Sequence, residues 1–157
     1  MTLPTGLTRR QFLVPAIAGI ALTSVARAAW AASPDVFAAK GLAIGGYDPV
    51  AYFKAGRPVP GKSQFSLVWR GATWRFADAD AMEAFEMNPK GYAPEYGGYC
   101  AYAMSKGAVA PTVPDAFTVY DGRLYLNYSL DVRTTWKQDI PGNVKKADAY
   151  WPEALQR

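Results

Sequence analysis

The dipeptide Asp121-Gly122 is the local feature that most constrains how this chain can fold. It separates two short segments, residues 117–120 and 123–126, that are rich in aromatic and aliphatic side chains. A two-residue loop of this composition favours a type I′ turn, because Asp and Gly tolerate the positive φ angles that both central positions need. The pattern therefore predicts a tight β-hairpin with Tyr120 and Arg123 at its base.

A second hairpin and several short helices account for most of the remaining chain. Residues 65–69 and 72–76 alternate in polarity on either side of Arg70-Gly71, which indicates another strand pair. Since strands and helices come in groups without βαβ alternation, the sequence predicts the α+β class, as a small single domain with two β-hairpins packed against several short helices. Helices are expected after Asp48-Pro49, from Asp80 (paired with Glu83) to about Asn88, around Cys100, after Ser129, and from about Asn143 to Trp151.

The N-terminus carries the pattern of an export signal. Arg9 and Arg10 form a twin-arginine pair, and an uncharged, largely apolar run follows over residues 12–26. That run is shorter than the roughly 20 apolar residues of a membrane span, so we expect a removable signal peptide over residues 1–31. Cleavage is predicted between Ala28 and Ser33, and an uncleaved anchor is the alternative. Residues 32–40 are expected to form a linker or a short helix, and residues 41–157 the folded domain.

This signal predicts a partner and a location. The twin-arginine export machinery would recognise the precursor, and the mature chain would be periplasmic or secreted, with no membrane attachment after cleavage. Of the 17 basic residues, Arg9, Arg10 and Arg27 precede the mature chain, and all 13 acidic residues lie at or beyond Asp35. Fourteen basic residues against thirteen acidic ones leave the mature chain near +1, which argues against nucleic acid as a partner.

The numbers of histidine and cysteine residues limit the kinds of active site that this chain can form. The chain contains no histidine, which excludes hydrolytic triads built on that residue. It has one cysteine, Cys100, so no internal disulfide can form. No constellation of side chains identifies an enzyme, and Cys100 becomes the residue that most needs an explanation.

Several ordered motifs resemble those of one known family. They are residues 47–53 (YDPVAYF), 74–76 (WRF), 88–89 (NP), 92–94 (YAP), 96–102 (YGGYCAY), 121–122 (DG) and 127–128 (NY). Together they resemble the exported YHS-domain proteins over about residues 40–152. The resemblance implies a small α+β module of the YHS type, with heavy-metal or redox involvement and no settled activity.

The chain departs from the metal-associated YHS modules at two positions. The resemblance implies a Cys after Asp-Pro-Val and another after the terminal Phe of the hairpin, where this chain has Ala51 and Ala77. Without those two thiols, a cysteine-rich site of the zinc type is not expected. Some exported relatives are described as selenoproteins, which implies redox chemistry at a position equivalent to a Cys.

Cys100 is the main candidate functional residue. If residues 98–106 form a helix, Cys100 and Met104 share a face, and a thiolate with a thioether is a ligand pair that copper(I) favours. Gly97-Gly98 would place the sulfur near the helix start, where a thiolate is stabilised. We expect Cys100 to be partly accessible and to face Asp48 in a concave site. Tyrosines would line that site, namely Tyr47, Tyr92, Tyr96, Tyr99 and Tyr102.

Each of these interpretations has a structural alternative. Cys100 and Met104 could be core residues, Asp48 a helix cap, and the tyrosines partly buried packing residues. The first functional prediction is a periplasmic module that binds a soft metal, preferably copper(I), or performs thiol redox chemistry at Cys100. The alternative is a non-catalytic module for a small ligand or a protein partner, in which Cys100 is an inert core residue.

Overall fold

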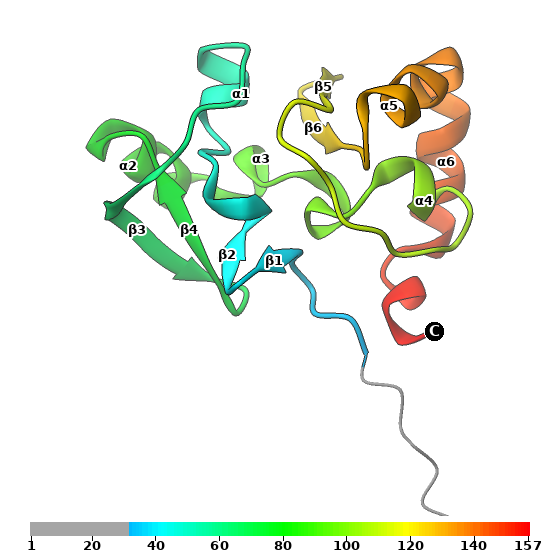
Figure 1. The fold of residues 1–157 in the computed structure, drawn as a ribbon, viewed down its shortest axis with the longest axis horizontal. Helices are drawn as coiled ribbons and strands as arrows, with labels where there is room; N and C mark the ends of the chain where they lie inside the picture. The colour runs from blue at the N-terminus through cyan, green and yellow to red at the C-terminus, as the bar shows by residue number, and fades with distance from the viewer. Residues whose placement is uncertain (1–31) are drawn as a thin grey trace, which may run out of the picture.

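The computed structural model describes residues 32–157, which form a mixed fold of short helices and two small sheets (Figure 1). The predicted class is confirmed, because two β-hairpins pack with several short helices in one small domain. Arg9, Arg10 and most of the predicted cleavage region lie outside the described residues. Within residues 32–157 no helix is long and apolar enough to cross a membrane.

Four strands form the first sheet, in the order β1-β2-β4-β3. β2 runs parallel to β4, whereas the β1–β2 and β3–β4 pairs are antiparallel. Alternate side chains of β4, including Trp74 and Phe76, are buried, and Phe85 of helix α2 packs against both rings. The elements of this part are β1 (Ala38–Ala39), β2 (Leu42–Ala43), α1 (Ala51–Lys54), β3 (Lys62–Trp69), β4 (Ala72–Phe76) and α2 (Ala79–Met87).

Residues 32–40 belong to the fold and are not a linker or a helix. Ala38 and Ala39 form strand β1, which pairs with β2, and Val36 is buried in the first hydrophobic cluster. The Phe37 amide also donates to the Gly97 carbonyl at 2.9 Å. The sequence did not predict β1, because the small side chains of residues 32–40 show no alternation of polarity. In addition, β1 pairs with a strand, β2, of only two residues.

The second part of the chain builds another hydrophobic cluster around Met104, Tyr125 and Trp136. Strand β6 joins the two clusters, because Leu124 and Leu126 face the first and Tyr125 faces the second. This shared strand makes the two halves one domain. The elements here are α3 (Pro89–Tyr92), α4 (Ala101–Met104), β5 (Phe117–Tyr120), β6 (Arg123–Leu126), α5 (Leu130–Trp136) and α6 (Ile140–Tyr150), with short 3-10 turns at η1 (Ile44–Gly46), η2 (Glu95–Gly98), η3 (Lys137–Asp139) and η4 (Glu153–Gln156).

The predicted turn at Asp121-Gly122 is confirmed. Asp121 has φ 49° and Gly122 has φ 71°, and Tyr120 pairs with Arg123 at the base of the β5–β6 hairpin. The predicted cap of α5 is also confirmed, since the Ser129 hydroxyl accepts the Val132 amide at 3.2 Å.

Three helix boundaries differ from the predictions. Asp78 and not Asp80 caps α2, because its carboxylate accepts the Ala81 amide at 2.8 Å. Helix α6 begins at Ile140 and not near Asn143, because Asp139 caps it by accepting the Gly142 amide. The helix expected over residues 98–106 is reduced to α4, Ala101–Met104, with the 3-10 turn η2 before it.

Replacing Gly122 by valine should lower the free energy of unfolding by about 1 kcal/mol or more, because a β-branched residue is strained at positive φ. Denaturant titration of the two proteins measures the difference. Asp121→Asn is the matched control, since Asn also tolerates the left-handed region and should change stability little. Equal stability of the valine variant and the parent would contradict the turn assignment.

Candidate functional site

The Cys100 thiol is a buried hydrogen-bonding centre between helix α4 and strand β6. Cys100 forms an isolated parallel bridge with Leu126 and precedes α4 as its N-cap residue. Its Sγ accepts the Ala103 amide at 3.4 Å and the Tyr128 amide at 3.3 Å. Two chain segments that are far apart in sequence are therefore joined through one sulfur atom.

Asn127 completes the surroundings of this sulfur. Its Oδ1 accepts the Tyr102 amide at 3.2 Å and lies 3.6 Å from Cys100 Sγ, which can donate its proton to it. Asn127 is fully buried, and its Nδ2 has no hydrogen-bond partner within residues 32–157. The Tyr102 N–H fixes the amide orientation, because only the oxygen can accept from it.

Cys100 is near a helix start, as expected, but the prediction of a partly accessible thiol is wrong. Its relative exposure is 1%, and it lines none of the three main pockets of the described chain. Tyr128, whose backbone amide donates to the sulfur, lines a surface depression together with Pro111, Thr112 and Val113. The sequence could not reveal this contact, because Tyr128 lies in the segment after β6, far from Cys100 in the chain.

The residues around Cys100 do not fit a copper(I) site. The sulfur already accepts two backbone amides, and Met104 is buried in the second cluster with Tyr96, Tyr125 and Trp136. Among residues 32–157, no three His, Cys, Asp or Glu side chains gather in a group that could hold a metal ion. Cys100 is thus a hydrogen-bonded cap, and Met104 is a residue of an aromatic core.

Asp48 does not face Cys100 and instead binds backbone amides in the first part of the fold. Its Oδ1 accepts the amides of Val50 at 2.8 Å and Ala51 at 3.3 Å, which confirms the helix-cap interpretation at the start of α1. Its Oδ2 accepts the Ala77 amide at 3.0 Å. The Asp48 residue is 1% exposed, so this carboxylate is a buried link between α1 and the end of β4.

The five candidate tyrosines do not converge on one site. The Tyr96 hydroxyl donates to Asp148 at 2.9 Å, and burial together with this hydrogen bond raises the pKa of Tyr96. The Tyr99 hydroxyl donates to the Pro34 carbonyl at 2.9 Å, and burial raises its pKa. The other three have separate neighbours: Tyr47 bridges to Pro60, Tyr92 meets Phe53 edge to face, and Tyr102 lies under Lys106.

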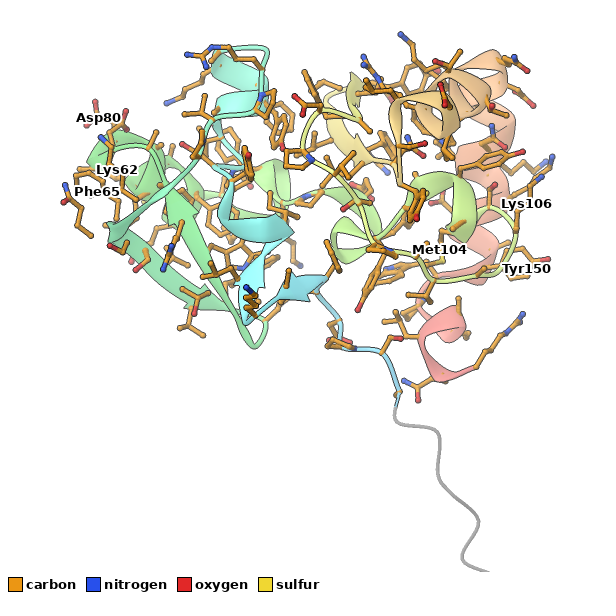
Figure 2. All side chains as sticks on the ribbon, in the orientation of Figure 1. Lys62, Phe65, Asp80, Met104, Lys106 and Tyr150 are labelled. Atoms are coloured by element: carbon orange, nitrogen blue, oxygen red, sulfur yellow. The ribbon has the colours of Figure 1, made fainter. Side chains whose placement is uncertain are left out.

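A groove between helices α1 and α2 has a volume of about 360 Å³. Its apolar surface comes from Val50, Ala51, Val59, Ala77 and Ala81, and its charged residues are Asp48, Lys54, Asp78 and Asp80. We call it the α1–α2 groove. Figure 2 shows Asp80 and Met104 on opposite sides of the view, and neither Cys100 nor Met104 lines the groove.

Sequence reasoning missed this groove, although one signal pointed to it. Ala51 and Ala77, the two positions at which the sequence resemblance implies cysteine, both line the groove. Comparisons with models of protein families, with curated proteins and with solved structures find no match for this chain. The residues themselves must therefore carry any functional argument.

Proposed function

We propose that this chain is an exported, non-catalytic binding module of the YHS type, which holds a small organic cation in the α1–α2 groove. In this proposal Cys100 is a structural residue that joins α4 to β6. The observation that carries the proposal is the placement of Ala51 and Ala77. Both line the groove, and both donate their backbone amides to the buried Asp48.

The YHS resemblance explains why this placement matters. Positions 51 and 77 are those at which the metal-associated modules carry cysteine, and here they lie together despite their separation in sequence. Two methyl groups in place of two thiols offer no ligand to a soft metal. The remaining groove, at about 360 Å³, falls in the size range of small-molecule sites.

Charge in the groove favours a cationic ligand. The exposed carboxylates of Asp78 and Asp80 outnumber the single ammonium of Lys54. The Asp48 carboxylate adds a further negative charge below them, although three backbone amides stabilise it. An amine with a hydrocarbon body would place its charge near the rim and its apolar part on the alanine and valine side chains.

Binding of phenethylamine to the purified chain tests this proposal. We expect the amine to bind more tightly than phenethyl alcohol, its uncharged analogue of similar shape. Asp80→Asn should weaken amine binding about two- to fivefold, because an exposed ion pair contributes up to about 1 kcal/mol. Titration calorimetry measures each dissociation constant.

Glu86→Gln provides the matched control, since it removes the same charge from an exposed residue of α2 that does not line the groove. It should leave amine affinity unchanged. Equal affinity for the amine and the alcohol would refute a cationic ligand. If Asp80→Asn and Glu86→Gln weakened amine binding equally, the affinity would depend on the net charge of the protein and not on the groove, which would also contradict the proposal.

A second candidate function is thiol chemistry at Cys100, which one specific observation favours. The amide N–H groups of Ala103 and Tyr128 both donate to the sulfur, which holds it in a fixed position. Because Cys100 is buried, such chemistry would require local opening of the turn that carries Tyr128. Rapid alkylation of Cys100 in the folded protein would support this candidate over the structural role.

A further inference from the structure

A second pocket lies where the two hydrophobic clusters meet. It is lined by Trp69, Arg70, Lys90, Glu95, Tyr96 and Trp151, together with small residues, and we call it the indole pocket. Trp69 packs on the first cluster and Trp151 on the second. Ligand sites occur preferentially at such boundaries between packed units. The indole pocket shares no lining residue with the α1–α2 groove.

Trp69 and Trp151 both line this pocket, and aromatic packing holds both rings in place. Trp69 meets Trp74 and Phe85 in edge contacts, with ring centroids 5.7 Å and 5.6 Å apart. Trp151 meets Tyr96 in an edge contact with centroids 6.1 Å apart. The pocket volume is about 180 Å³, and a cavity of about 150 Å³ holds benzene. One six-membered ring with a small substituent therefore fits.

The turn that carries Tyr96 is held in an unusual backbone conformation. Tyr96 has φ 54° and Gly97 has φ 62°, and a tyrosine in this left-handed region is strained. Surrounding contacts maintain the turn: the Tyr99 amide donates to the Tyr96 carbonyl at 3.0 Å, and the Tyr96 hydroxyl donates to Asp148. Backbone strain of this kind is concentrated at ligand sites.

The charges of the pocket favour an anion. Arg70 and Lys90 both line it, and the Arg70 guanidinium lies over the Trp69 ring at 4.7 Å from its centroid. Glu95 is the one acidic residue in the lining. The lining thus carries two positive charges, from Arg70 and Lys90, against the one negative charge of Glu95, and this excess can balance an anion from outside the protein.

We propose that the indole pocket binds a small aromatic carboxylate, with its ring between Trp69 and Trp151 and its carboxylate toward Arg70 and Lys90. Guanidinium groups bind carboxylates through charge-assisted hydrogen bonds, and indole rings stack on planar aromatic bodies. The site is independent of the cation site proposed above, because its residues and its ligand charge both differ.

Titration of isotope-labelled protein with benzoate tests this inference by NMR. We expect the indole N–H signals of Trp69 and Trp151 to shift, while that of Trp136 stays, because the Trp136 side chain is fully buried and does not line the pocket. Benzyl alcohol, which lacks the charge, and acetate, which lacks the ring, should each bind at least about fivefold more weakly. Signals of Trp69 and Trp151 that do not move at high benzoate concentration would overturn the proposal.

Two variants distinguish a built anion site from general attraction to a basic surface. Arg70→Asn keeps a residue that tolerates the φ of 49° at this turn and should weaken benzoate binding at least about fivefold. Arg57→Asn removes the same charge from an exposed residue outside the pocket and should leave binding unchanged. Equal losses in the two variants, or benzyl alcohol binding as tightly as benzoate, would contradict the assignment.

Discussion

Replacing Asp48 by alanine is expected to lower the free energy of unfolding by about 3 to 5 kcal/mol, the largest effect of any substitution considered. The Asp48 carboxylate accepts the backbone amides of Val50, Ala51 and Ala77. Val50 and Ala51 are buried, so their amides would lose their acceptor without gaining water. Urea unfolding of the parent and the variant, followed by tryptophan fluorescence, measures the loss.

Two further variants define the origin of that loss. Asp48→Asn keeps one oxygen acceptor but presents an amide N–H₂ to the other donor, so an intermediate loss is expected. Asp78→Ala removes an exposed helix cap of α2 and should cost only about 1 kcal/mol. An Asp48→Ala protein within 1 kcal/mol of the parent would mean that the buried link between α1 and β4 contributes little.

Cys100→Ala is expected to lower the free energy of unfolding by about 2 to 3 kcal/mol, the second largest effect. The alanine variant leaves the amides of Ala103 and Tyr128 without the sulfur that accepts them. A small cavity in a fully buried position adds to the cost. Thermal and urea unfolding of the two proteins measure the difference.

Cys100→Ser separates the hydrogen-bonding role from the chemistry of sulfur. A serine hydroxyl can accept an amide but reaches less far than sulfur, so it should recover part of the lost stability. If Cys100 is structural, both variants should keep the parent affinity for phenethylamine. An alanine variant that is as stable as the parent would contradict the capping role of the thiol.

The sequence predicted the turns and helix caps whose geometry is set by residues close together in the chain. Asp121-Gly122 predicted the β5–β6 turn because positive φ at adjacent positions restricts the choice of residues. Ser129 predicted the start of α5, because a cap acts within three residues. The order of strand and helix signals was sufficient for the α+β class.

Long-range contacts decided the rest of the candidate site, and the sequence did not reveal them. Whether Cys100 is exposed depends on Asn127 and Tyr128, which reach it only through the pairing of β6. The local sequence predicted that Asp48 lies at a helix start. It did not predict the hydrogen bond that Asp48 accepts from the Ala77 amide, because Ala77 follows strand β4 of the first sheet. Met104 lies in the short helix that Cys100 caps, yet it is packed among aromatic residues of three other elements.

The most direct test of a ligand site in the α1–α2 groove is to map phenethylamine binding on the backbone amide spectrum of isotope-labelled protein. The amide signals of Ala51 and Ala77 are expected to shift, because both residues line the groove and both donate to Asp48. The amide signals of Ala103 and Tyr128, which donate to the Cys100 sulfur, should stay in place. Shifts confined to Ala103 and Tyr128, or no shift at either pair, would contradict a ligand site in the groove.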